Sequence, residues 1–215
     1  MAIRFRGMLQ DFSQLEYGFL PPGAQKLNEG EDLENIIVQA MRQSLPLFLL
    51  VAALTVVRLW KGLDWSRGVH FSELMLGSLV WIVVYFLLIV LHECLHALFF
   101  PRRAVKDVWF YQMQAAMVYC NTPVTRTRFI VMSLTPAVIL GFLPFAGWLF
   151  GAALVSPVFS LLWLAMSWSM IFGGLGDFYN VRNVVEQVPK DTLVFNYGIH
   201  TYWIMDPRKK KMSKK

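Results

Sequence analysis

Residues 74–91 read LMLGSLVWIVVYFLLIVL and are followed directly by the run His92-Glu93-Cys94-Leu95-His96. The first 18 of these residues carry no charge, which is the length and composition of a helix that crosses a lipid bilayer. Two histidines and a glutamate follow at the end of this stretch, where ionisable side chains are costly unless they serve a site. The sequence therefore predicts a membrane span that ends in a cluster of polar side chains.

The composition of the whole chain supports a membrane location. The 215 residues are 56% hydrophobic and only 16% charged, which is more apolar surface than a soluble domain of this size can bury. A second uncharged run covers the 48 residues from Phe129 to Gly176, enough for two spans. Leu45 to Trp60 is a shorter candidate whose Arg58 would extend to the interface. We expect an all-α membrane protein with about four transmembrane helices.

Three segments follow from this pattern. Residues 1–44 are a polar N-terminal segment, 45–185 a membrane domain, and 186–215 a basic cytoplasmic tail. The first segment holds a short amphipathic helix, which lies on the bilayer or packs as a lead-in to the first span. Its apolar residues at helical spacing are Leu33, Ile36, Ile37, Ala40 and Met41.

The long uncharged run contains signals for a bend and a break. Pro136 and Pro144 lack a backbone N–H, so we expect the third span to be bent or broken unless neighbouring segments satisfy the freed carbonyls. The run should break again between Gly151 and Pro157, which separates the third span from the fourth.

The distribution of Lys and Arg predicts the orientation. With four spans, 17 of the 20 Lys and Arg residues fall on the side of the two termini and the central loop. The positive-inside rule then places both termini in the cytoplasm of a multi-pass protein of the cell membrane. The basic tail from Arg208 lacks interleaved aromatic residues, so we expect contact with lipid and none with nucleic acid.

The run at the end of the second span has the spacing of a metal site. On a helix, His92 and His96 are one turn apart and can bind the same ion, while Glu93 lies beside them. Neutral imidazoles leave the charge of zinc largely unquenched, so a water on the metal ionises near neutral pH and a carboxylate can take its proton. The alternative is that both histidines only hydrogen-bond to neighbouring helices.

A catalytic zinc site takes a third protein ligand. Asp177 is the first charged residue after the 48-residue run and ends the fourth span on the same side as His96, so we expect it at the depth of the histidines. Glu186 is the second candidate. In the alternative interpretation, Asp177 only caps the end of the fourth helix.

Residues between the second and third spans have a composition typical of strands. Val105 to Tyr119 is rich in Val, Trp, Phe and Tyr, with a possible turn around Gln114-Ala115-Ala116. We expect a small β-hairpin, which either offers an edge to a peptide or only packs on the bundle. Three further residues are expected outside the site: His70 on the opposite face, His200 at the surface, and Cys94 in packing.

The chain resembles the zincin peptidase family of small bacterial membrane proteins. The resemblance rests on the H-E-x-x-H run, a segment similar to Ser133-Leu134-Thr135-Pro136, and Gly176-Asp177. The chain is also similar to the site-2 protease class of intramembrane metalloproteases, although that class carries an Asn-Pro-Asp-Gly-type sequence around its aspartate. The resemblance implies zinc bound by His92, His96 and Asp177, with Glu93 as general base.

Two functions are consistent with these observations. The first is a membrane-embedded zinc endopeptidase that hydrolyses membrane proteins or peptides with an activated water molecule. The second is a non-catalytic multi-pass protein that uses the same cluster for structure or metal binding. Glu93 favours the enzyme, because a metal-binding scaffold does not need a carboxylate beside its ligands.

Overall fold

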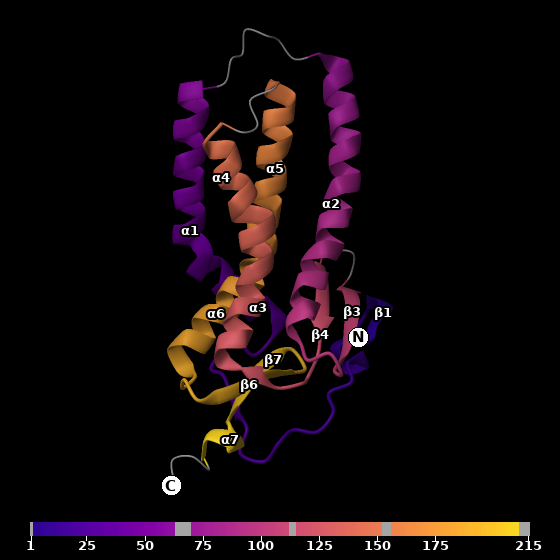
Figure 1. Ribbon diagram of the computed structural model, residues 1–215, viewed down its shortest axis with the longest axis vertical. Coiled ribbons are helices and arrows are strands. Elements are labelled where there is room, and N and C mark those ends of the chain that lie inside the picture. The colour runs from indigo at the N-terminus through magenta and orange to yellow at the C-terminus, as the bar shows by residue number, and fades with distance from the viewer. Residues whose placement is uncertain (1, 63–69, 112–114, 152–155, 211–215) are drawn as a thin grey trace.

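A computed structural model describes residues 2–62, 70–111, 115–151 and 156–210. Long helices run side by side along the longest axis, and two small sheets lie toward one end of them (Figure 1). The first and last elements, β1 and α7, both lie at the end that carries the sheets. The opposite end consists of helices alone in the part of the chain that is described.

The protein is mostly helical. The helical elements are α1 (Leu33–Gly62), α2 (Phe71–Phe99), α3 (Arg126–Pro136), the π-helix η3 (Ala137–Phe142), α4 (Leu143–Leu149), α5 (Pro157–Gly173), α6 (Leu175–Gln187) and α7 (Pro207–Lys210), with a short 3-10 turn η1 (Phe12–Gln14) near the N-terminus.

Three helices are long and apolar enough to cross a membrane: Leu33–Trp60, Phe71–Phe99 and the continuous rod Arg126–Leu149. In α2, none of the residues in the most apolar 18-residue window is buried inside the protein, as expected of side chains that face lipid. A fourth span exists only if α5 and α6, which meet at a 41° bend, form one span together. Three helices therefore have the length and composition of membrane spans, and the expected fourth depends on this broken pair.

The first span differs from its predicted bounds. The amphipathic segment from Leu33 and the apolar segment from Leu45 form the single helix α1. Pro46 lies inside α1 without ending it, because the rest of the helix supplies enough hydrogen bonds to continue past one missing N–H. The boundary that we drew between residues 44 and 45 falls within this helix.

The predicted irregularity of the third span takes the form of a π-helical turn. The rod passes from α3 through η3 to α4, with Pro136 at the end of α3 and Pro144 at the start of α4. Gly141 lies so close to α5 that an added Cβ would come within 3.0 Å of the backbone nitrogen of Ile171. Of the expected break before Pro157, residues 152–155 lie outside the described ranges; α5 then begins with Ser156 as its N-cap.

One sheet joins the N-terminus to the segment after α2. Its strand order is β1 (Ala2–Leu9), β3 (Val105–Tyr111), β4 (Ala115–Tyr119), with β1 parallel to β3 and β3 antiparallel to β4. Of the residues expected to form the turn, Gln114 lies outside the described residues, while Ala115 and Ala116 belong to β4. The parallel strand β1 was not predicted.

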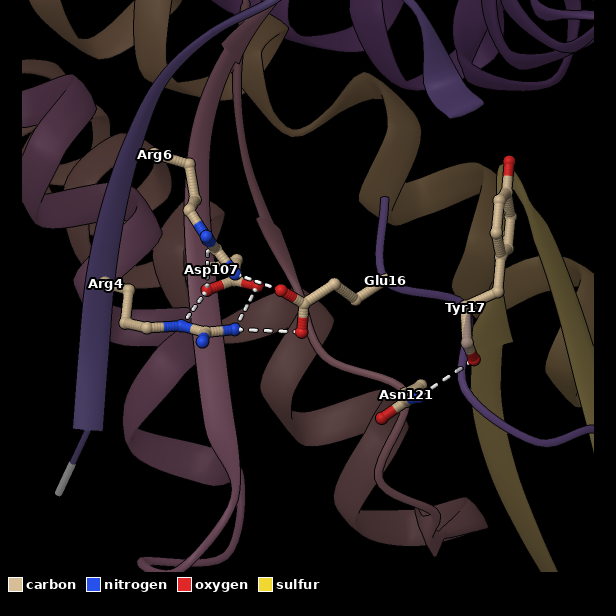
Figure 2. A network of polar contacts seen from close by, with 6 residues as sticks. All are labelled: Arg4, Arg6, Glu16, Tyr17, Asp107 and Asn121. Atoms are coloured by element: carbon tan, nitrogen blue, oxygen red, sulfur yellow. Dashed lines mark hydrogen bonds and ion pairs between the residues drawn. The ribbon is translucent and has the colours of Figure 1, made fainter. Parts of the chain in front are cut away.

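A cluster of charged residues holds β1 on β3 (Figure 2). Arg4 donates two hydrogen bonds to the carboxylate of Asp107, at 2.7 and 2.8 Å, and Arg6 donates a third at 3.3 Å. Glu16 accepts from both arginines. Burial opposes ionisation of Asp107, but the two arginines prevail and lower the pKa of its carboxyl below the ordinary value.

The second sheet was also missed by the sequence interpretation. Its order is β2 (Gln25–Lys26), β7 (His200–Met205), β6 (Thr192–Tyr197), β5 (Val124–Thr125), and each neighbouring pair is antiparallel. The prediction of an all-α fold with one hairpin is therefore wrong in its strand content: the fold is mostly helical with two small sheets. Two of these strands, β6 and β7, lie in the segment from residue 186 onward that we expected to be a basic tail.

Candidate metal centre

The two histidines lie in the last turns of α2, next to the sheets. Because α2 stays helical to Phe99, His92 and His96 project from one face, with ring centroids 4.9 Å apart. His92 is only 7% exposed, and the His96 side chain is 13% exposed. The apolar helix therefore places two imidazoles where little of either side chain is exposed.

Asp177 reaches the same space from the start of α6. The chain bends between α5 and α6 at Gly174, where an added Cβ would lie 3.0 Å from Cβ of Ala137. A larger residue would push α6 away from the rod, so the close approach at this glycine sets where the first turn of α6 lies. Asp177 is in that first turn.

The three side chains form one group. Oδ2 of Asp177 lies 3.4 Å from Nε2 of His92 and 3.4 Å from Nε2 of His96. One ligand atom from each residue lies within 4.8 Å of the other two. Among the described residues, these three side chains are the group that could hold a metal ion.

These distances fit co-ligands of one metal ion better than hydrogen bonds. A strong N–H···O hydrogen bond is about 2.7–3.2 Å long, so 3.4 Å is too long for one. Ligand atoms about 2.0–2.1 Å from a tetrahedral zinc ion stand roughly 3.3 Å apart, close to the separation seen here. Two imidazoles and a carboxylate are also a donor set that zinc prefers in catalytic sites. The residues present therefore fit zinc.

The ring of His96 is oriented by a backbone carbonyl. Its Nδ1 lies 3.1 Å from the carbonyl oxygen of Met132 on α3. A carbonyl only accepts, so Nδ1 must carry the proton, which leaves Nε2 with its lone pair free for a metal. No signal at Met132 itself could have revealed this partner, since every residue has a carbonyl.

Glu93 lies next to the ligands but is not one of the three. It is 7% exposed, and the backbone N–H of Val118 on β4 interacts with its carboxylate. This contact ties the acid to the free edge of the sheet, because β4 pairs with β3 along its other edge. Glu93 thus stands between the histidine pair and an accessible strand.

Two cavities meet at this group. The larger, about 370 Å³, is lined by His92, Glu93, His96 and Asp177, together with residues of α3, β4 and the β6–β7 hairpin. The smaller, about 120 Å³, extends from His92 and Glu93 toward Tyr85 on α2 and Ser169 on α5. The centre is therefore open toward the sheets and toward the space between two candidate spans.

A second pair of titratable groups lies beside Thr201, one of the residues that line the larger cavity. Glu29 accepts a 2.6 Å hydrogen bond from the N–H of Thr201, and its Oε1 lies 3.4 Å from Nδ1 of His200. Burial raises the pKa of Glu29 to about 7, although Thr201 and Lys26 oppose this. Burial and the charge of Lys26 lower the pKa of His200.

The remaining sequence candidates lie elsewhere. Glu186 pairs with Arg182 on the exposed face of α6 and is not part of the group. His200 lies beside Glu29, and His70 is the N-cap of α2 at the other end of that helix. Cys94 is a free cysteine of intermediate burial.

Comparison with known proteins gives one match. The model of the family described as "Putative zincin peptidase" matches residues 85–193, just over half of the 215-residue chain. The chain belongs to this family. Membership of the zincin peptidase family suggests a zinc metallopeptidase, and the matched region includes His92, Glu93, His96 and Asp177. No curated protein and no solved structure matches the chain.

Proposed function

We propose that this zincin peptidase family member is a zinc-dependent endopeptidase of the cell membrane, which cuts membrane proteins or peptides. The observation that carries the proposal is the group of His92, His96 and Asp177, with 3.4 Å between Asp177 and each histidine and the carboxylate of Glu93 beside them. Family membership supports the reaction class.

In the proposed hydrolysis, different residues of the chain bind the metal, transfer the proton and orient the base. Zinc bound there would polarise the scissile carbonyl and favour ionisation of a water molecule. Glu93 accepts the proton of the attacking water and delivers it to the leaving nitrogen. The N–H of Val118 interacts with the Glu93 carboxylate and helps to orient it beside the ligands.

The edge of β4 supports an extended substrate. Ala116, Met117 and Val118 line the larger cavity, and β4 is the outer strand of its sheet among the described residues. A peptide segment in extended form can add to such an edge through backbone hydrogen bonds. This suits hydrolysis, because the carbonyls of a helical substrate are occupied within the helix.

The smaller cavity supports access from the bilayer. It lies between α2 and α5, and most of the outer surface of α2 is apolar and exposed. We propose that both termini are cytoplasmic, as the 17 basic residues on their side suggest, so that the centre lies near the inner membrane surface.

Metal analysis combined with a cleavage assay tests the function. The purified protein in detergent should contain about one zinc per chain. After reconstitution in liposomes with single-span test substrates, it should cleave some of them, stop when a chelator removes zinc, and recover when zinc is returned. His92→Ala should lack both zinc and cleavage. Zinc binding without cleavage of any substrate would favour the non-catalytic metal-binding protein.

A further inference from the structure

The backbone of α3 lacks one hydrogen-bond donor next to the metal centre. In an α-helix each N–H bonds to the carbonyl four residues earlier, and proline has no N–H. Pro136 keeps helical dihedral angles, with φ −62° and ψ −47°, so the helix continues through it. The carbonyl that it leaves without an α-helical partner is that of Met132.

The next amide does not take this carbonyl either. The N–H of Ala137 donates to Leu134. Met132 is a buried residue, and a buried carbonyl without a partner is unfavourable. The partner that the structure provides is Nδ1 of His96 on α2, at 3.1 Å.

We propose that Pro136 is a positioning residue for the metal ligand His96. By lacking an N–H, Pro136 leaves the Met132 carbonyl free to accept the Nδ1 proton of His96, and this hydrogen bond presents Nε2 to the group that contains Asp177. The inference rests on the proposed zinc centre, and it adds a residue that touches neither metal nor substrate.

The same rod contains a proline that offers a comparison. Pro144 lies in the first turn of α4, and its own carbonyl accepts a 2.8 Å hydrogen bond from Nε1 of Trp163. Its missing N–H removes a donor from the rod directly after the π-helical turn, beside an apolar cavity that Leu140 and Pro144 line between α2, the rod and α5. Replacing Pro144 adds the same N–H to the same rod, away from the ligands.

Three variants separate the N–H from the ring of proline. Pro136→Ala restores the N–H, which can then compete with His96 for Met132. Pro136→lactic acid, introduced as an α-hydroxy acid, has the shape of alanine but an ester oxygen in place of the N–H. Pro144→Ala is the matched control. Zinc affinity is measured by competition with a chromogenic chelator. Cobalt(II) absorption reports ligand geometry, and unfolding of the zinc-free protein reports fold.

We expect Pro136→Ala to bind zinc about 10-fold or more weakly, as loss of an orienting partner does, and to change the cobalt spectrum. Pro136→lactic acid should bind close to the parent, as should Pro144→Ala. In the zinc-loaded parent, nitrogen NMR of labelled histidine, assigned with His96→Gln, should show the proton of His96 on Nδ1.

Two results overturn the inference while leaving the proposed function intact: Pro136→Ala binding zinc like the parent, or Pro136→lactic acid being as weak as Pro136→Ala, which would place the effect in the ring. A parent that binds zinc but cleaves nothing contradicts the peptidase proposal only, and the affinity series still decides the role of Pro136. A parent that takes up no zinc contradicts both.

Discussion

Oδ2 of Asp177 lies 3.4 Å from Nε2 of His92, although three strands, the rod and α5 separate their helices in the chain. An ordinary hydrogen bond would draw them closer, whereas shared coordination of a zinc ion holds ligands about this far apart. The relationship makes Asp177, and not Glu186, the expected third ligand.

Asp177→Ala should lower zinc affinity by about 10- to 100-fold or more, because it removes the only charged ligand of the proposed set. Glu186→Ala is the matched control, since Glu186 is exposed and paired with Arg182. Chelator competition measures both. If the control weakened binding and Asp177→Ala did not, the ligand assignment would be reversed.

The orientation in the membrane can be tested by labelling. Cysteines are introduced singly at Trp65 and in the tail at Ser213, in a background without Cys94 and Cys120. With both termini cytoplasmic, an impermeant maleimide added to intact cells should label the cysteine at position 65 and not that at 213. The opposite pattern would show that the topology is inverted.

Much of the centre was predictable because it is local. The two histidines lie on one helix, where a spacing of four residues places them on one face. Asp177 was predicted from its position directly after an uncharged run, since the length of a span determines how deep in the membrane its last residues lie. These signals depend on spacing along one segment.

The strands were not predictable in the same way. β1 pairs with β3 about a hundred residues later, and the register is fixed by Arg4 and Asp107, whose contact leaves no pattern in either segment alone. The partner of His96 is a backbone carbonyl, which has no residue signature. Its sequence signal, Pro136, was visible only as a bend, since the sequence does not show which neighbour takes a freed carbonyl.

The attachment of β1 should weaken in acid. The pKa of Asp107 is lowered in the folded protein, so its ionisation stabilises the fold above the ordinary value of 3.8 and the contribution is lost as pH falls through the lower folded value. Asp107→Asn should increase hydrogen exchange of the β1 amides by about 5- to 10-fold at neutral pH. Once corrected for intrinsic rates, the hydrogen exchange of the β1 amides should increase less on acidification in Asp107→Asn than in the parent. Equal acid dependence would exclude Asp107 as the cause.

For Glu29 we expect the opposite dependence, a loss of stability as pH rises toward neutral. Its folded pKa is raised to about 7, so the neutral carboxyl is favoured, and stability present below the ordinary value of 4.5 is lost as pH rises through about 7. The groups around it are the N–H of Thr201, His200 and Lys26. Because the pKa of His200 is lowered, protonation of His200 destabilises the folded protein as pH falls below 6.5.

Glu29→Gln isolates the carboxyl. Between pH 5 and 8 the parent should lose stability relative to this variant by on the order of 1–3 kcal/mol, measured by chemical unfolding in detergent. His200→Gln serves as the control and should keep the loss caused by Glu29. A parent and a Glu29→Gln variant with parallel pH profiles would show that the carboxyl ionises normally.

Glu93→Gln separates an enzyme from a metal-binding scaffold. The amide keeps the size of the side chain and an oxygen that can face the N–H of Val118, but it no longer takes a proton from water. Zinc held by His92, His96 and Asp177 should therefore stay bound, while cleavage should fall by at least about 100-fold, the usual contribution of a positioned base.

His92→Ala is the comparison for this variant, since it should lose zinc and cleavage together. Zinc content, affinity and cleavage rate are measured on the same preparations, so that loss of metal and loss of the base are distinguished. If Glu93→Gln cleaved at the parent rate, Glu93 would not be the base and the mechanism would be wrong. If it lost zinc as well, Glu93 would act as a ligand, which the group of His92, His96 and Asp177 does not require.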